Sequence, residues 1–389
     1  MKAAEGKNEK SQIGNVLVVN TGSITTKFAF YADGEQVLCQ KLEHPIDVLS
    51  RFGDVMQQEQ MRTEAIMESL SSFNVRLEEI DLVMARGGLF SPCVTGVYNV
   101  NDDMKEVLGS SRDGKHACNL SAIIADRISN EVNEIRAQKG ISPRFGRCVA
   151  YVADPPMADE MLPECRVGGI PEFPRTTLFH ALNSRAIMRR FLKESALKAS
   201  ETNVIVCHMG GGVTVSLHHD GKVADCTHGL GGDGPITPER AGSCPPFPLI
   251  DMCFSGKYTK DEIKKKLIGE GGAVAYFKTN DMRLIEQRAM EGREEYVVFL
   301  KAFILNIAKC ILGISATVDG HVDAILLTGG VAFSKYITDG ISKKVSFLAP
   351  VKVYPGENEL ESLAENGYFI LAGEVPIHTY NKNKLLENL

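Results

Sequence analysis

The sequence contains three glycine-bearing turns with the residue types that bind phosphate groups. In NTGSITTK (20–27) hydroxyl side chains flank Gly22, and HMGGGVT (208–214) has three consecutive glycines. A third segment, LTGGVAFSKY (327–336), ends an apolar run and opens an expected helix. Only glycine lets a backbone approach an anion closely with a positive φ, and flanking N–H and hydroxyl groups then donate to phosphate oxygens. A glycine-rich hairpin is more often a plain tight turn, so no single one identifies a phosphate site.

Two arginines have the chemistry needed to hold a second anion beside a phosphate. Arg86 ends the apolar run DLVMARGG, and Arg240 lies in the Gly/Pro-rich segment PERAG. A guanidinium group forks onto carboxylate or phosphate oxygens and stays charged at working pH. The alternatives are a surface salt bridge for Arg86 and stapling of the loop for Arg240. Neither a Walker A pattern nor GxGxxG occurs in the chain, which disfavours the P-loop and Rossmann classes.

The first two turns lie in segments that resemble each other. VLVVNTGSITTKFAFYADGEQV begins at Val16 and VIVCHMGGGVTVSLHHDGKV begins at Val204. Each has an apolar strand, a glycine turn, a second strand and an Asp-Gly turn into a third strand. This repetition indicates a duplicated two-domain protein.

Other segments predict the layers that position these turns. Apolar runs predict strands at 80–88, 147–156, 322–330 and 351–357. Helical periodicity predicts helices at 61–73, 119–138, 176–199, 258–269 and 359–375. Alternating strands and helices predict an α/β fold, with mixed sheets because the two Asp-Gly hairpins are antiparallel. The last helix is expected to return and pack on the first domain.

The composition is that of an ordinary soluble globular protein and weighs against several other classes. The 389 residues carry 43 Lys and Arg against 49 Asp and Glu, a net charge of −6, with no basic run. This weighs against binding nucleic acid. The longest apolar stretch, 295–318, is interrupted by Lys301, Asn306 and Lys309, so it predicts a core helix and no membrane segment.

The N-terminus and the cysteines indicate the compartment. MKAAEGKNEKSQ has no apolar region, so no signal peptide is expected, and residues 1–12 are expected to be a disordered tail. The ten cysteines show no CxxC spacing. Unpaired thiols suit a reducing compartment, and we therefore expect a cytoplasmic protein.

Taken together, the three turns resemble those of the acetate and sugar kinase/Hsp70/actin superfamily. Asn20 stands where most of that superfamily has Asp, which is similar to the carboxylate kinases. Four segments, 154–191, 232–245, 254–272 and 354–367, resemble the butyrate kinase branch of the acetokinase family, and the resemblance runs from about Val16 to about Val375. Two departures are Thr21, where many relatives have Pro, and Cys244, where an aliphatic residue is usual.

The resemblance implies a fold and a reaction. The fold would be two duplicated ribonuclease H-like (actin-like ATPase) domains with an interdomain cleft, formed by 13–170 with 365–389 and by 171–364. The reaction would be butyryl phosphate + ADP = butyrate + ATP by direct in-line transfer, with ATP or ADP and Mg²⁺ as cofactors and a homo-oligomer, dimer or larger, as the assembly. Acetate, propionate or isobutyrate are alternative substrates, and a nucleotide-dependent regulatory switch is an alternative of another class.

The resemblance also implies roles for individual residues. Arg86 would bind the substrate carboxylate or the transferring phosphoryl group, and Arg240 would clamp the transition state. His180 would donate to the transferring phosphoryl oxygens, and Asp154 would orient the cluster. On sequence alone, His180 is more often a core residue early in a helix, and Asp154 a cap or turn before two prolines. The nucleotide would be held by Asn20, Gly22, Ser23, Thr25, Lys27, His208, Gly210, Gly211, Gly212, Gly329, Gly330 and Phe333. Lys27 could equally be only solvated.

Magnesium is implied by the reaction, because no ligand cluster spells out a site. Glu357 and Glu359 in YPGENEL, with Asn20, are the candidate ligands. Mg²⁺ keeps several waters and needs only one or two carboxylates. The alternative for the two glutamates is the acidic first turn of the C-terminal helix, which the helix dipole favours.

Overall fold

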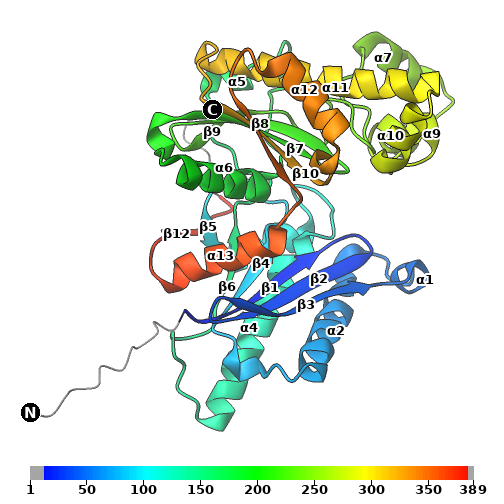
Figure 1. Cartoon of the computed structure of the whole chain (residues 1–389). Helices are drawn as coiled ribbons and strands as arrows, with labels where there is room; N and C mark the ends of the chain where they lie inside the picture. The colour runs from blue at the N-terminus through cyan, green and yellow to red at the C-terminus, as the bar shows by residue number, and fades with distance from the viewer. Residues whose placement is uncertain (1–12, 384–389) are drawn as a thin grey trace, which may run out of the picture. The chain divides into compact units, whose positions relative to one another are not determined.

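The chain forms two compact units. The computed structural model describes residues 13–383, so the expected disordered tail 1–12 lies outside the described residues. Unit 1 contains residues 13–155 and 359–383, and unit 2 contains residues 156–358 (Figure 1). Each unit has one mixed β-sheet with helices on both faces, as the alternation of strand and helix patterns predicts.

The elements of unit 1 come from both ends of the chain. They are β1 (Asn15–Thr21), β2 (Thr25–Ala32), β3 (Glu35–Glu43), α1 (Ile46–Leu49), η1 (Val55–Gln58), α2 (Glu59–Ser72), η2 (Leu77–Glu79), β4 (Leu82–Arg86), β5 (Val97–Asn99), α3 (Asp102–Ser110), α4 (Asn119–Lys139), β6 (Ala150–Ala153), α13 (Glu359–Leu371) and β12 (Ile377–Thr379). Within the described residues, the sheet order is β12-β5-β6-β4-β1-β2-β3.

Unit 2 is built from the middle of the chain. Its elements are α5 (Pro163–Arg166), α6 (Ala181–Ser195), η3 (Ala199–Glu201), β7 (Asn203–Met209), β8 (Val213–His219), β9 (Lys222–Cys226), α7 (Pro246–Phe254), α8 (Lys260–Leu267), α9 (Gly272–Phe277), α10 (Met282–Met290), α11 (Glu294–Ile314), η4 (Ser315–Val318), β10 (Ala324–Gly329), η5 (Gly330–Phe333), α12 (Lys335–Val345) and β11 (Val351–Pro355). The sheet order is β11-β10-β7-β8-β9.

The repeated segments form the same substructure in both units. In unit 1, β1, β2 and β3 are successive antiparallel strands and β1 pairs with β4 in parallel; in unit 2, β7, β8, β9 and β10 repeat this pattern. Both Asp-Gly turns have two residues with positive φ, 45° and 94° at Asp33 and Gly34 and 50° and 75° at Asp220 and Gly221. Such turns match the twist of antiparallel strands. The duplication predicted from the sequence is confirmed.

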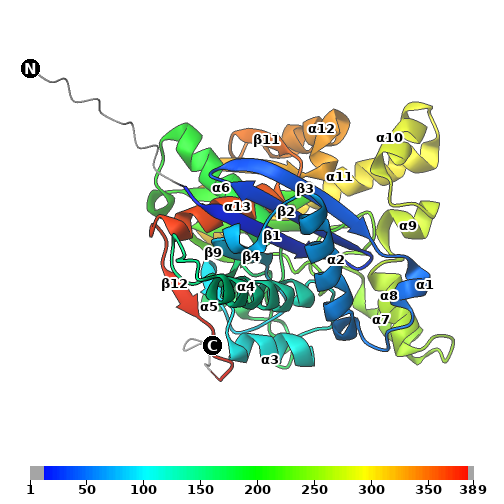
Figure 2. The same ribbon diagram turned by 90° about the horizontal axis from the view of Figure 1, so that it is seen from below.

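In unit 1, helices cover both faces of the sheet. Helix α13 packs on β1 and β4 from one side, while α4, with α2 beside it, covers the other (Figures 1 and 2). Gly367 allows α13 to approach closely, because a Cβ there would lie 2.9 Å from a methyl group of Val16. The C-terminal helix therefore packs on the first domain, as predicted, and it ends at Leu371, four residues before the predicted 375.

Unit 2 buries its largest apolar cluster between its sheet and α11. By length and composition, Glu294–Val318 is the one helical segment among the described residues that could cross a membrane. Phe303, Ile307 and Ile311 of this helix are fully buried in the cluster. The segment is therefore a core helix, as its interrupting charges predict.

The chain passes from one unit to the other at different positions from those expected. The sequence placed the changes at 170/171 and 364/365, whereas the chain passes between units at 155/156 and 358/359. The segment after Pro156 belongs to unit 2 because it pairs with β9 there: the Leu162 N–H donates to the Ala224 carbonyl at 2.9 Å, and the Val223 N–H donates to the Glu160 carboxylate at 3.0 Å. The whole of α13, from Glu359, belongs to unit 1.

Candidate functional site

The carboxyl ends of three parallel strands bring the unit 1 candidates to one edge of the sheet. β1, β4 and β6 are adjacent and parallel, with Val19 opposite Ala85 and Arg86 opposite Ala153. Asn20 therefore lies near the end of β1 and Arg86 at the end of β4, and Asp154 directly follows β6. This is the edge at which α/β sheets bind ligands.

Glu359 joins Asn20 and Arg86 into one polar cluster. Its Oε2 accepts a hydrogen bond from Asn20 Nδ2 at 2.6 Å, and its Oε1 lies 3.6 Å from Arg86 Nη1. Asn20 is 4% exposed, whereas about a third of the Arg86 side chain is exposed. Two of the three candidate metal ligands, Asn20 and Glu359, are thus in contact within unit 1.

Asp154 has a strained backbone that a partner holds in place. Its φ is 43°, in the left-handed region, and it is buried. Its N–H donates to the Gly96 carbonyl at 2.8 Å, and its Oδ1 accepts from the Gly96 N–H at 3.0 Å. Left-handed conformations of residues other than glycine gather at functional sites. Asp154 lies at a bend directly after β6, and its role as an orienting carboxylate stays a prediction.

In unit 2, His180 and His208 are stacked face to face. Their ring centroids are 3.8 Å apart with 11° between the planes. His180 Nδ1 lies 2.8 Å from the Thr214 hydroxyl, and His208 Nδ1 lies 2.7 Å from Asn183 Nδ2. Since an amide N–H₂ can only donate, Nδ1 of His208 accepts and its Nε2 carries the proton. That proton points to Glu357, whose Oε1 is 3.1 Å from Nε2.

His180 differs in one respect from its prediction. It was expected early in a helix spanning 176–199, but α6 begins at Ala181 and His180 is the residue before it, with φ −78° and ψ 62°. The preceding residues 176–179 are not helical, and the Phe179 N–H bonds to the Pro156 carbonyl. The helix therefore begins one residue after His180, whose imidazole contacts Thr214 of β8.

The second glycine turn is packed between two charged groups. A Cβ on Gly210 would lie 2.7 Å from Glu357 Oε1, and a Cβ on Gly212 would lie 2.1 Å from Arg240 Nη1. Neither residue, nor Gly22 in the first turn, has a positive φ. The expectation that left-handed backbone explains these glycines was wrong. They are needed because side chains approach the backbone closely.

Arg240 is held beside this turn by its own loop. The Thr237 hydroxyl donates to the Gly211 carbonyl at 2.9 Å and accepts from the Arg240 N–H at 2.9 Å. The guanidinium Nη1 donates to the Gly229 carbonyl at 2.7 Å. Burial lowers the pKa of Arg240, with Glu239 opposing the shift, and the group stays cationic at neutral pH.

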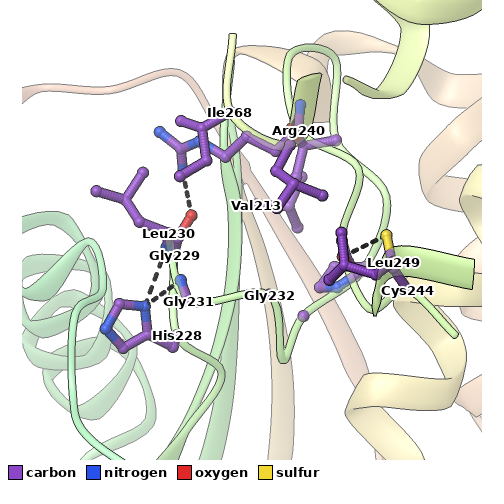
Figure 3. Close-up of a pocket in the computed structure, with 15 residues that line it drawn as sticks. Val213, His228, Gly229, Leu230, Gly231, Gly232, Arg240, Cys244, Leu249 and Ile268 are labelled. Carbon is purple, nitrogen blue, oxygen red and sulfur yellow. Dashed lines mark hydrogen bonds between the residues drawn. The ribbon is translucent and has the colours of Figure 1, made fainter. Parts of the chain in front are cut away.

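The described residues contain a small pocket of mixed polarity beside Arg240, with aliphatic side chains in part of its lining. It has a volume of about 160 Å³ and includes Val213, Leu230, Leu249, Leu267 and Ile268 in its lining. Figure 3 shows Arg240 and Ile268 at one side of this pocket, with the hydrogen bond to Gly229 drawn. Cys244 lines the other side and has an exposed thiol. The pocket therefore combines a cationic group with room for a small apolar chain.

A larger pocket of unit 2 adjoins the second glycine turn. Its volume is about 1230 Å³. The predicted nucleotide residues that line it are Gly210, Gly211, Gly330 and Phe333, together with Glu357. Phe333 is 72% exposed and offers a ring surface for stacking. The structure therefore brings the predicted adenosine loop and the second phosphate turn to one cavity.

Gly329 has a structural role at this place. Its φ is 90°, and a Cβ would lie 2.4 Å from the Met209 carbonyl oxygen. Only glycine fits where β10 passes so close to β7. Lys27, by contrast, is exposed on β2, opposite Asn20 and Lys41 in the neighbouring strands.

Several polar residues beside His208 or in the wall of the larger pocket were not predicted. Asn183 follows His180 by three residues, a helical spacing that could have indicated it. Glu239, Asn280 and Arg283 line the larger pocket, where Asn280 Nδ2 donates to Glu239 at 2.6 Å. They lie in loops and at the start of α10, far apart in sequence, and only the fold reveals that they share a wall.

Two duplicated units, each with a hairpin of this kind and a mixed sheet, are the fold of the actin-like ATPase class. The chain belongs to the acetokinase family, whose model matches residues 175–367. It is 41% identical to the probable butyrate kinase of Bacteroides thetaiotaomicron over 366 residues, 94% of this chain and 99% of the relative. It is also 41% identical to butyrate kinase 2 of Clostridium acetobutylicum, with the same coverage.

Solved structures confirm the fold class. The acetate kinase of Porphyromonas gingivalis superposes with a TM-score of 0.70 at 17% identity, covering 92% of this chain and 100% of that chain. A propionate kinase from Francisella tularensis superposes with a TM-score of 0.66 at 19% identity, covering 91% and 98%. The predicted activity class, a carboxylate kinase that uses an adenine nucleotide, is confirmed by the family.

Proposed function

We propose that the chain transfers a phosphoryl group reversibly between butyryl phosphate and ADP, by direct in-line displacement. The names of the full-length relatives support butyrate as substrate. The observation that carries the proposal is the position of the Arg240 guanidinium, which lies against the second glycine turn and lines a small pocket that also has aliphatic side chains. A cavity of about 150 Å³ holds a ligand as large as benzene. The pocket of about 160 Å³ is therefore large enough for a chain of three or four carbons.

The roles of the side chains follow from the chemistry of the transfer. Phosphoryl transfer relies on positioning and on stabilising charge on the transferring oxygens. Arg240 and Arg86 are proposed to supply that charge, and His180 to donate to the same oxygens. Asn183 and Glu357 hold the His208 ring in place, and His180 stacks on that ring. The larger pocket is proposed to bind the adenosine, with Phe333 as a stacking surface.

Magnesium is proposed to bind through Asn20 and Glu359. No group of three or more His, Cys, Asp or Glu in the described residues could hold a metal alone. The site fits an ion that arrives with nucleotide phosphates, because Mg²⁺ needs only one or two protein oxygens. Asn20 and Glu359 are in contact at the edge of the unit 1 sheet, where Glu359 also faces Arg86 at 3.6 Å, whereas Glu357 faces His208 in unit 2. When bound, the ion would neutralise charge on the phosphates.

Replacement of the two glutamates tests this choice. We expect Glu359→Gln to raise the Mg²⁺ concentration needed for half-maximal activity by about 10-fold or more. A Mg²⁺ site has only one or two protein carboxylates, so the loss of one removes much of the binding. Glu357→Gln is expected to leave that concentration near the wild-type value and to change KM for the nucleotide. The measurement is a Mg²⁺ titration of hydroxamate formation, with calorimetric Mg²⁺ binding to the ATP complex as a readout besides activity. The reverse pattern would assign the ion to Glu357.

A panel of acids tests the proposed substrate. Straight and branched acids of two to five carbons are compared by kcat/KM, with ATP and hydroxylamine trapping the acyl phosphate. We expect butyrate to be preferred. A preference for acetate, propionate or isobutyrate would replace butyrate within the same chemistry. No hydroxamate with any acid, despite ATP binding, would favour a regulatory switch.

A substitution in the pocket tests whether this pocket sets the preference among acids. We expect Cys244→Phe to fill the pocket and to lower the butyrate-to-acetate ratio of kcat/KM by about 10- to 100-fold, as one or two methylenes are worth that much. Cys253→Phe is the matched control, because Cys253 is also exposed but does not line the pocket. An unchanged ratio in the Cys244→Phe variant would show that the alkyl chain binds elsewhere.

A cytoplasmic location and a homo-oligomer, dimer or larger, remain predictions. The ten cysteines all lie in the described residues and are free thiols, which supports a reducing compartment. Light scattering after size-exclusion chromatography measures the assembly.

A further inference from the structure

A buried arginine lies directly behind the first glycine turn. Arg62, from α2, is 0% exposed. Its Nη1 donates to the carbonyls of Gly22 at 3.0 Å and Thr25 at 2.9 Å, and its Nη2 donates to the carbonyl of Ser23 at 2.9 Å. Three carbonyls of one short turn therefore point inward to a single guanidinium group.

Polar side chains complete the surroundings of this guanidinium. Gln58 Oε1 accepts from Nε at 3.1 Å and from Nη2 at 2.8 Å. The Thr26 hydroxyl accepts from Nη1 at 3.0 Å and lies 2.8 Å from His44 Nε2. Burial lowers the pKa of Arg62 to about 10, so the group is still charged at neutral pH. Burial and then the charge of Arg62 lower the pKa of His44, which keeps that ring neutral.

No carboxylate compensates this charge. Among residues 13–383, no ion pair includes Arg62. A fully buried cation without a counter-ion is costly, and it persists only where many hydrogen bonds hold it. Its acceptors are carbonyl, amide and hydroxyl oxygens, none of which is negative. The positive charge therefore remains effective at the turn.

The inward carbonyls fix the direction of the neighbouring N–H groups. In a trans peptide the N–H points opposite to the C=O of the same peptide plane. With the carbonyls of Gly22 and Ser23 turned toward Arg62, the N–H groups of Ser23 and Ile24 turn away from it. In the described part of the chain no hydrogen-bond acceptor is found for these two N–H groups, while the Gly22 N–H closes the turn onto the Thr25 carbonyl at 2.8 Å. Two successive N–H groups aimed outward form an anion-binding nest.

We infer that Arg62 is a positioning residue that holds the first glycine turn with the N–H groups of Ser23 and Ile24 presented to a phosphate oxygen of the nucleotide. This inference rests on the proposed function, since it takes the anion to be a phosphate of ATP or ADP. Arg62 acts from behind the turn and does not touch the ligand. The charge of the guanidinium and the direction of the two N–H groups both favour an anion on the outer face.

Substitution of Arg62 tests the inference, with nucleotide affinity as the readout. We expect Arg62→Met to weaken ADP binding by about 10- to 100-fold, as the loss of hydrogen bonds to a charged group predicts. KM for ATP is expected to rise by a similar factor, with KM for the acid unchanged. Arg62→Lys is expected to fall between wild type and Arg62→Met, because lysine keeps the charge but lacks the fork that reaches three carbonyls.

Arg136 provides a matched control in the same unit. It is also a buried helix arginine, 4% exposed, and it donates to the carbonyls of Glu78 and Ile80 at 2.9 Å each, before the start of β4. That is the edge of the sheet opposite the candidate site. Arg136→Met is expected to lower the Tm comparably without changing the affinity for ADP. Equal changes in ADP affinity in the two variants would reduce Arg62 to a structural role and overturn the inference.

A second variant and a separate assay keep the outcomes distinct. Gln58→Leu removes the one oxygen that accepts two hydrogen bonds from the guanidinium, and it serves if Arg62→Met does not fold. It is expected to weaken ADP binding in the same direction. ADP binding is measured by calorimetry without any acid. A wild-type chain that binds ADP but forms no acyl hydroxamate would overturn the proposed function alone, whereas unchanged ADP affinity in Arg62→Met or Gln58→Leu would overturn the inference alone. A wild-type chain that binds no nucleotide would overturn both.

Discussion

The Arg240→Ala variant is expected to fold and to lose at least ~10²-fold in kcat, the usual effect of deleting a donor to transition-state charge. The guanidinium lies against the second glycine turn and lines the small pocket, so its charge is placed where a carboxylate and a phosphate would meet. Within residues 13–383 its guanidinium donates one hydrogen bond, to the Gly229 carbonyl, which leaves the rest of the fork available for a ligand. Steady-state kinetics with butyrate and ATP, beside a thermal melt, measure the effect.

Arg185 is a control for the alternative role of loop stapling. Arg185 Nη1 donates to the Gly221 carbonyl at 2.8 Å, so it too holds a turn of unit 2. If Arg240 only staples its loop, Arg185→Ala and Arg240→Ala should reduce stability and activity alike. We expect Arg185→Ala to keep kcat within about 3-fold of wild type, as for substitutions that leave the reacting groups in place. Near wild-type kinetics for Arg240→Ala would remove that residue from the mechanism.

The fold was predictable because its strongest signals are local. The Asp-Gly turns at 33–34 and 220–221 have positive φ at both residues, as tight hairpin turns do, and each hairpin shifts its register once, at Phe30/Tyr31 and at Leu217/His218. Repetition of this hairpin then indicates duplication. The start of the helix predicted at 176–199 was wrong, since α6 begins at Ala181. Phe179 and His180 follow helical spacing, but their N–H groups donate to the Pro156 carbonyl and the Thr214 hydroxyl. Tertiary hydrogen bonds decided that boundary.

The candidate site was predictable in its residue types but not in its contacts. Glu357 and Glu359 are two positions apart, yet one bonds His208 in unit 2 and the other bonds Asn20 in unit 1. The change of unit between them follows from where α13 packs, which no motif encodes. Arg62 lies in α2, where its sequence neighbours do not distinguish it from a surface charge. Only the turn of the chain behind residues 22–25 makes it a buried group.

Gly212→Ala is expected to lower kcat/KM by about 10- to 100-fold, the effect of moving a catalytic group by roughly 1 Å. A Cβ at this position would lie 2.1 Å from Nη1 and 2.5 Å from Cζ of Arg240, so the guanidinium must leave its place. Because Gly212 does not have a positive φ, the backbone tolerates alanine and the cost arises from this contact.

A double-mutant cycle separates this mechanism from a direct role of Gly212 in binding phosphate. In the Arg240→Ala background the obstructed guanidinium is absent, so we expect Gly212→Ala to lower kcat/KM by less than about 3-fold there. The difference between the two backgrounds measures the interaction between the two contacting residues. If alanine at 212 costs the same factor in both backgrounds, the turn itself contacts the substrate and the Cβ excludes the phosphate. A coupling energy near zero between the two substitutions would therefore contradict the geometry that places Arg240 against the glycine turn.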